Sequence, residues 1–188
     1  NDTENKNLLE YGIGDGPNTE HLLRQGYTIH GIDISEGALK STEKRLENDI
    51  DLIKNLKLTK LSIDAQKLDF EDNTFDYIVA LSVLSLLGDI NRINCLLSEF
   101  KRITKIGGKL ILDINDHDSE FSAGKKQIDE NVFLLDPNEE NMKCYCLKNE
   151  EAFKSMLEKF FEIKDIGFSA HKVFGRRINE WLACAVNK

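Results

Sequence analysis

The chain has 188 residues, of which 40% are hydrophobic and 31% are charged, and its formal net charge is −8. This balance is typical of a globular domain with a sizeable core, and no apolar run approaches the roughly 20 residues that a membrane-spanning helix needs. The acidic total disfavours a protein that neutralises a nucleic-acid backbone, because such proteins usually present a basic surface.

In the first half of the chain, short apolar runs alternate with longer segments of helical periodicity. The pattern predicts strands at 7–12, 28–34, 57–63 and 75–82, a helix at 18–25, and a helix from Ser35 to Ile53. Ser35 offers an N-cap oxygen for the second helix. Because the run at 75–82 is apolar on both faces, it suits a central strand of a covered parallel sheet.

The second half begins with the clearest helix, which Asp89 opens and Gly107–Gly108 end. The pattern then predicts a strand at 109–114, a hairpin of 132–135 with 143–147, a helix capped by Asn149, and strands at 162–172 and 179–186 with Arg176 and Arg177 in the turn between them. This alternation predicts an α/β fold with a doubly wound sheet and an antiparallel strand at one edge. We expect one domain over residues 1–188, preceded in the complete protein by a further N-terminal segment.

The most informative stretch is residues 10–16, EYGIGDG, between the first strand and the first helix. Open parallel sheets bind ligands just beyond the carboxyl ends of their strands, and glycines there let the backbone approach the ligand and adopt positive φ angles. Counting from Gly12, the sixth position of a G-x-G-x-x-G dinucleotide fingerprint is Pro17. The loop therefore disfavours an NAD-type site, and a Walker-type loop fails because no G-K-S/T follows.

Two carboxylates close the next two predicted strands. Asp33 ends the second strand and can accept both ribose hydroxyls of an adenosine with its two oxygens. Asp64 ends the third strand, within reach of an adenine amino group at the same sheet edge. The joint placement of the glycines and both acids favours an adenosine-bearing, cationic ligand over an anionic pyrophosphate.

These motifs resemble the E/D-x-G-x-G-x-G signature of the class I, Rossmann-like S-adenosylmethionine-dependent methyltransferases. The later landmarks match in chain order: Asp33, Asp64-Ala65, the FDYIV run at 75–79, and the RITKIGGKL run at 102–110, which is similar to the family's L-K-P-G-G turn. The resemblance covers nearly the whole chain. It is strongest to the small-molecule subgroup that includes the ubiquinone-biosynthesis type.

The resemblance implies a seven-stranded, mostly parallel sheet with an antiparallel last strand. It also implies S-adenosylmethionine as cofactor and assigns its contacts. Glu10 orients the methionine amino group, the glycines lie against the cofactor, and Asp33 binds the ribose. The full set of implied cofactor-binding residues is Glu10, Gly12, Gly14, Gly16, Asp33, Ile34, Asp64, Ala65 and Leu81.

No residue is a clear catalytic base. The family often carries histidines after strand four, but here that stretch is SVLSLL, residues 82–87. His117, after the fifth strand, is a weak candidate for a proton acceptor, and the alternative is a solvated loop histidine. Asp116, His117 and Asp118 are consecutive, so their three side chains cannot all bind one ion without an unusual backbone conformation. We therefore predict no metal site. The spacing of the four cysteines fits neither zinc nor disulfides, which indicates a reducing, cytoplasmic setting.

The sequence therefore predicts an S-adenosylmethionine-dependent methyltransferase acting on a small molecule, without a membrane partner. Since the sulfonium already activates the methyl group, alignment of the acceptor matters more than a base. A non-catalytic or regulatory subunit with the same fold is the first alternative. An NAD-type oxidoreductase and a protein or nucleic-acid methyltransferase are less favoured, and the acceptor and the oligomeric state stay open.

Overall fold

A mixed seven-stranded sheet forms the centre of the computed structural model, which describes residues 6–63, 65, 67–139 and 141–188. Across the sheet, the strands are β3 (Leu56–Lys60), β2 (Thr28–Asp33), β1 (Asn7–Tyr11), β4 (Phe75–Ala80), β5 (Thr104–Asn115), β10 (Arg176–Val186) and β9 (Glu162–Val173). Strands β1 to β5 are parallel, whereas β10 runs antiparallel to β5 and β9. The order confirms the predicted doubly wound sheet. The antiparallel last strand lies inside the sheet, and β9 forms the edge.

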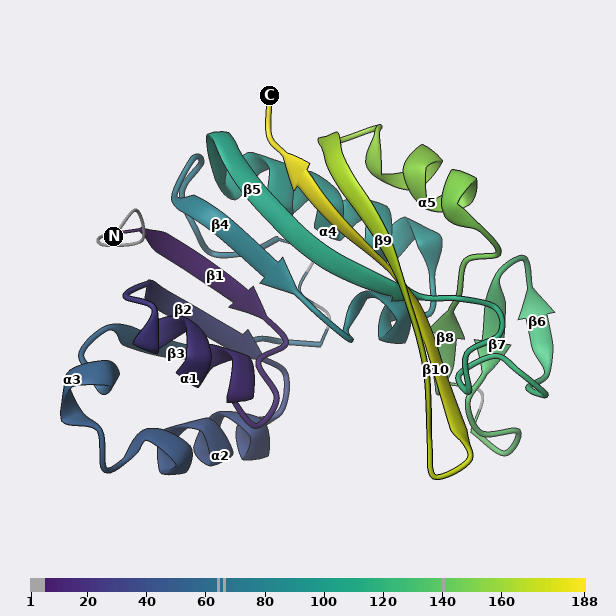
Figure 1. Cartoon of the computed structure of the whole chain (residues 1–188), viewed down its shortest axis with the longest axis horizontal. Helices are drawn as coiled ribbons and strands as arrows, with labels where there is room; N and C mark the ends of the chain where they lie inside the picture. The colour runs from purple at the N-terminus through teal and green to yellow at the C-terminus, as the bar shows by residue number, and fades with distance from the viewer. Residues whose placement is uncertain (1–5, 64, 66, 140) are drawn as a thin grey trace.

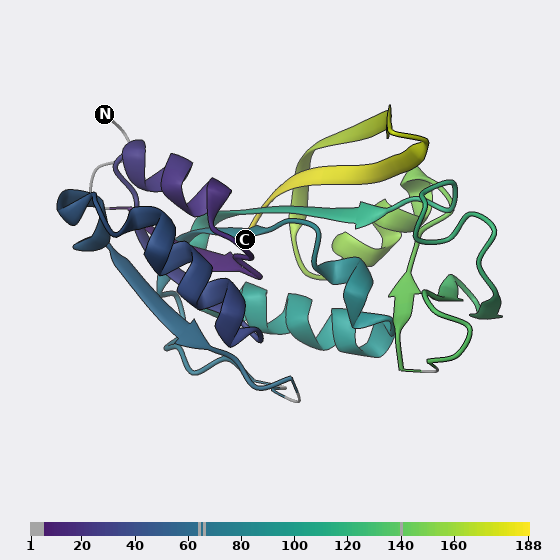
Figure 2. The same cartoon turned by 90° about the horizontal axis from the view of Figure 1, so that it is seen from below.

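Helices cover both faces of this sheet (Figures 1 and 2). They are α1 (Pro17–Arg24), α2 (Glu36–Leu46), α3 (Ile50–Ile53), α4 (Ile90–Ile103) and α5 (Glu150–Leu157). Alternate residues of a strand point to opposite faces. Leu8 of β1 therefore packs with Leu23 of α1 and Leu46 of α2, whereas Leu9 packs with Phe100 of α4 in the larger core cluster.

Two predicted helix boundaries were wrong. The helix expected from Ser35 to Ile53 is interrupted after Leu46, and Asp49 starts the separate turn α3 by accepting the Leu52 N–H. Ile50 is 70% exposed, so it does not extend the buried stripe of α2.

Helix α4 ends at Ile103 rather than at the predicted Gly107–Gly108. Thr104 already has extended backbone and opens β5. Gly107 donates to the Asn187 carbonyl and the Asn187 N–H donates to the Gly108 carbonyl, so both glycines pair with the end of the chain.

The C-terminal part adds a small three-stranded sheet of β6 (Gln127–Asp129), β7 (Val132–Leu134) and β8 (Lys143–Tyr145). The antiparallel pairing of β7 with β8 confirms the predicted hairpin. Strands β9 and β10 form a long hairpin that extends past the carboxyl end of β5 (Figure 1). Arg176 and Arg177 were placed wrongly in its turn, because they pair with Val173 and Lys172 as the first residues of β10.

Among the described residues, every helix falls short of the length and apolarity that a bilayer crossing requires.

Candidate cofactor site

The glycine loop, residues 11–16, leaves β1 at the carboxyl end of the sheet and leads into α1 (Figure 1). The Gly12 N–H donates to the Ile32 carbonyl at 2.8 Å, which ties the start of the loop to β2. The Gly14 N–H donates to the Asp33 carboxylate at 3.0 Å. Both bonds join the loop to the neighbouring strand, so the position of the loop is set by the β1–α1–β2 unit.

The three glycines of the loop all have left-handed backbone, but their surroundings differ. The φ angles are 77° at Gly12, 55° at Gly14 and 76° at Gly16. A Cβ at Gly12 would lie 2.9 Å from the Val83 side chain, and one at Gly16 would lie 2.6 Å from the Thr42 hydroxyl oxygen. A Cβ at Gly14 would meet nothing within 4 Å. Gly14 is therefore the glycine whose bare backbone faces open space.

Helix α2 supports the loop from the other side. The Thr42 hydroxyl donates to the Gly14 carbonyl at 3.1 Å, and the Arg45 Nε donates to the Asp15 carbonyl at 2.8 Å. Sequence reasoning missed both side chains, because nothing in the spacing of α2 indicates which of its polar residues face the loop.

Asp33 ends β2 and is held by backbone donors on both sides. One carboxylate oxygen accepts the Gly14 N–H, and the other accepts the Ser35 N–H at 2.8 Å. A carboxylate oxygen has two lone pairs, so each keeps one for a further donor. Asp33 thus fixes the glycine loop and retains the capacity to bind a pair of hydroxyls.

Glu10 lies behind the loop, at 3% exposure. Its carboxylate accepts the Thr19 hydroxyl of α1. Burial raises the pKa of Glu10 to about 7, and the Thr19 bond opposes part of that rise. Near neutral pH the group can therefore gain or lose a proton, and a nearby cation would favour its charged form.

The remaining implied contacts are apolar. Ile34 is 51% exposed beside Asp33, Ala65 is exposed, and Leu81 is half-buried after β4, against the cluster that contains Leu8. Asp64 lies outside the described residues.

The end of β4 contains a residue that sequence reasoning missed. Ser82 has a φ of 57°, which is unusual for a residue with a side chain. Its N–H donates to the buried Asp113 carboxylate of β5 at 2.7 Å. Burial raises the pKa of Asp113 to about 7. Because the Val83 side chain lies against Gly12, this bond helps to position the segment after β4 beside the glycine loop.

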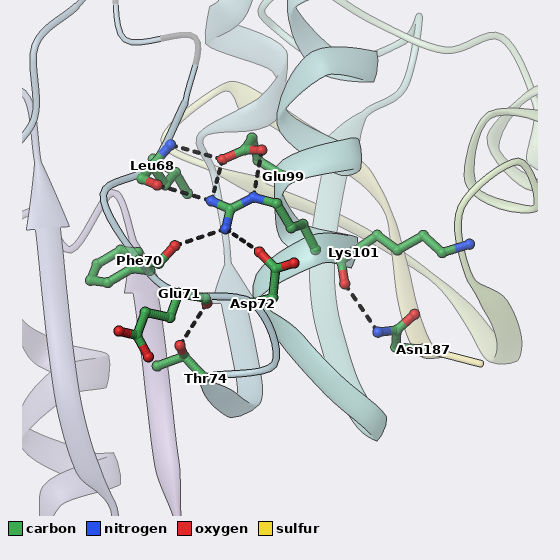
Figure 3. A network of polar contacts seen from close by, with 9 residues as sticks. Leu68, Phe70, Glu71, Asp72, Thr74, Glu99, Lys101 and Asn187 are labelled. Carbon is green, nitrogen blue, oxygen red and sulfur yellow. Dashed lines mark hydrogen bonds and ion pairs between the residues drawn. The ribbon is translucent and has the colours of Figure 1, made fainter.

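The connection between β3 and β4 is fixed against α4 by one guanidinium group (Figure 3). Arg102 donates to the carbonyls of Leu68 and Phe70 at 3.0 and 2.7 Å, and it pairs with Glu99 and Asp72. The Leu68 N–H also donates to Glu99. Four of these five contacts join the connection to α4, and the fifth, between Arg102 and Glu99, lies within α4. Together they fix the position of residues 68–72 against the helix.

His117 lies in the segment that follows β5. Its Nε2 bonds the Asn131 side-chain oxygen at 2.8 Å, and its ring packs edge-on against Phe133 of β7, with centroids 5.1 Å apart. The flanking Asp116 accepts the Trp181 indole N–H at 3.1 Å. The His117 contacts attach the small sheet to the end of β5, and the Asp116–Trp181 bond attaches that end to β10. Among the described residues, no three His, Cys, Asp or Glu side chains cluster as metal ligands.

Comparison with known proteins gives a consistent picture. The model of a family described as "Methyltransferase domain" matches residues 9–112. A phosphatidylethanolamine N-methyltransferase of Cereibacter sphaeroides is 32% identical over 106 residues, which are 56% of this chain and 48% of that protein. A demethylmenaquinone methyltransferase of Renibacterium salmoninarum is 34% identical over 105 residues, 56% of this chain and 39% of that protein. The chain thus spans less than half of these two relatives.

Solved structures show the same fold. A structure described as an S-adenosylmethionine-dependent methyltransferase from Methanosarcina mazei superposes with a TM-score of 0.80 at 23% identity, covering 98% of this chain and 93% of that chain.

Proposed function

This chain belongs to the methyltransferase-domain family, and we propose on that premise that it transfers a methyl group from S-adenosylmethionine to a small-molecule acceptor. The observation that supports the proposal most directly is the pairing of Gly14 with Asp33. Gly14 exposes bare backbone to open space while its N–H holds the Asp33 carboxylate beside it. An adenosine-bearing ligand needs both features in one place.

We assign the cofactor contacts as follows. The free lone pairs of Asp33 accept the ribose hydroxyls, and the exposed Ile34 and Ala65 give the adenine an apolar surface. Glu10, in its ionised form, attracts the methionine ammonium through the loop. When bound, S-adenosylmethionine supplies a methyl group that its sulfonium has already activated.

Methyl transfer mainly requires the protein to align the acceptor atom behind the methyl carbon and to exclude water. We propose that the segment after β4, which the Ser82–Asp113 bond holds and whose Val83 lies against Gly12, contributes to both. A proton acceptor is needed only where the acceptor atom must lose a proton early. We therefore assign no catalytic base, and His117 is proposed as a support of the small sheet.

The names of the relatives indicate the class of acceptor. They include enzymes for phosphatidylethanolamine, phosphoethanolamine and demethylmenaquinone. We propose a small molecule of this range rather than a protein or a nucleic acid. We also propose that residues 1–188 act as one domain in the cytoplasm, which agrees with four free cysteines.

Calorimetry with S-adenosylmethionine and S-adenosylhomocysteine tests the cofactor site. We expect micromolar binding, roughly −8 kcal/mol, and a loss of about 1.5–3 kcal/mol in Asp33→Ala because a charge-assisted bond disappears. Asp165→Ala, which removes an exposed carboxylate on β9, is the matched control and should bind like the parent. Equal affinity of the parent and Asp33→Ala would remove Asp33 from the site.

Formation of S-adenosylhomocysteine with phosphatidylethanolamine, phosphoethanolamine and demethylmenaquinone tests the activity. Turnover with any of them supports the enzyme. Tight cofactor binding without turnover across a wider acceptor panel would instead favour the non-catalytic subunit, and binding of NADH would favour the oxidoreductase.

A further inference from the structure

A concave site separate from the glycine loop lies against β2 and β3. A cavity of about 400 Å³ is bounded by β2, β3 and the connection that follows β3. His30 of β2 pairs in register with Lys57 of β3, and Ile32 pairs with Thr59, so these four side chains share one sheet face. Gly31, between them, faces the other way, toward Ile13 of the glycine loop.

The floor of this cavity is apolar and aromatic. Ile32 and Leu68 are 2% and 3% exposed and belong to the main core, and Leu61 packs beside them. The Phe70 ring lies edge-on to the His30 ring, with centroids 4.7 Å apart. Such a floor favours a flat hydrocarbon or aromatic group over a hydrated ion.

The wall is held in place before any ligand arrives. Arg102 bonds the carbonyls of Leu68 and Phe70, and Glu99 bonds the Leu68 N–H (Figure 3). These bonds fix the two residues that close the cavity on the side of α4. A site fixed in this way costs less ordering free energy when a ligand binds.

The rim is positively charged, although the chain carries a net charge of −8. Lys57, Lys60 and Lys67 line the cavity together with a single carboxylate, Asp69. Lys60 pairs with Glu36 at 3.5 Å, whereas within the described part of the chain no salt bridge joins Lys57 or Lys67 to a carboxylate. Two ammonium groups that form no salt bridge among the described residues, over an apolar floor, complement an anion that carries a ring.

We propose that this cavity binds a small aromatic anion, with the ring on Phe70 and Ile32 and the anionic group between Lys57 and Lys67. The site is distinct from the cofactor site, since none of its lining residues is among those assigned to the cofactor. A ligand bound there would contact His30 and Ile32 of β2, the strand that ends in Asp33.

His30 provides a local reporter of occupancy. Its Nε2 bonds the Thr59 hydroxyl at 2.8 Å. Burial, reinforced by Lys57, lowers the pKa of His30 to about 4. An anion placed beside Lys57 would offset that charge and raise the pKa of His30.

Anilinonaphthalene sulfonate, an aromatic anion, is the probe for the first experiment. We expect saturable binding to the full chain and a fall in affinity of about tenfold or more in the Lys57→Glu, Lys67→Glu double variant. Lys159→Glu, at an exposed lysine elsewhere, is the matched control and should bind like the parent. The Lys57→Gln, Lys67→Gln pair should show a smaller fall, and uncharged phenylnaphthylamine should bind more weakly than the sulfonate.

A nuclear magnetic resonance titration of the His30 ring places the probe. The pKa of His30 should rise when the dye is saturating and should not move in the double Glu variant. Equal dye affinity in the parent and the double variant, or an unchanged His30 titration, would overturn the proposal. Saturating S-adenosylhomocysteine should leave the dye affinity unchanged, so competition between the two ligands would also overturn it. None of these results bears on cofactor binding measured by calorimetry.

Discussion

The glycine loop and the segment after β5 are both at the carboxyl end of the sheet, but they are built in different ways. The loop is held by residues within about 30 positions of it, such as Asp33 and Thr42. The segment after β5 is held by partners much further along the chain, including Asp116 with Trp181 and Glu120 with Arg176. The first region has a recognisable local motif. The second has none, because its contacts depend on where the final hairpin lies.

Within the loop, glycines serve two different purposes. Gly12 and Gly16 have left-handed backbone and no room for a Cβ, whereas Gly14 has left-handed backbone and open space. Two glycines therefore serve packing, and one serves the ligand. Variants at these positions should separate stability from binding.

Gly16→Ala should have the largest effect on stability. The left-handed backbone costs about 1–2 kcal/mol for a residue with a Cβ, and the clash with Thr42 adds about 1–3 kcal/mol. Urea unfolding measures the change. Gly14→Ala, the matched control, should lose only the backbone part but should weaken S-adenosylhomocysteine binding. Equal unfolding free energies of the two variants would contradict the packing role of Gly16.

Glu10 and Asp113 should make the protein less stable as the pH rises. Burial raises the pKa of each from its ordinary value, 4.5 or 3.8, to about 7. The folded state therefore favours the protonated group, and stability falls as the pH rises from about 4 to 7. Glu10→Gln should remove up to about 3 kcal/mol of this fall, seen by comparing thermal unfolding at pH 5 and pH 8. Asp113→Asn should behave alike, and a parallel pH profile for parent and variants would count against both assignments.

Arg102→Ala should cost about 2 kcal/mol, because the carbonyls of Leu68 and Phe70 lose this donor and Glu99 keeps only the Leu68 N–H. The matched variant is Arg176→Ala, whose guanidinium is exposed and, within the described part of the chain, forms salt bridges with Glu120 only. It should change stability much less, since exposed pairs are screened by water. Chemical unfolding measures the unfolding free energy of both variants. An equal loss in Arg176→Ala and Arg102→Ala would contradict this contrast. Arg102→Ala should also weaken dye binding at the cavity.

His117→Gln should have the smallest effect, a loss of about 1 kcal/mol from the Asn131 bond and the Phe133 contact. Turnover with any accepted substrate should stay within a few-fold of the parent. A double-mutant cycle with Asn131→Ala measures the coupling between the two side chains. Loss of turnover with stability intact would make His117 catalytic and would move the active centre into the second region.

Much of the architecture could be predicted from the pattern of residues. The strand runs that became β1, β2 and β4 are short and apolar, and their alternation with helical segments left few possible topologies. The ends of two helices could not be predicted in this way. The sequence of Gly107–Gly108 suggests a helix end, but these glycines pair with Asn187 near the chain terminus, a contact that no local pattern contains.

By itself, the sequence determined the sheet, the place of the glycine loop and the carboxylate that ends β2. These features depend on periodicity and on backbone freedom at particular residues, which are local properties. Only the tertiary structure decided that Gly14 faces open space, that Asp113 holds Ser82, and that Lys57 and Lys67 face an apolar floor. Each of these depends on which side chains meet after the chain has folded, and spacing along the sequence does not record that.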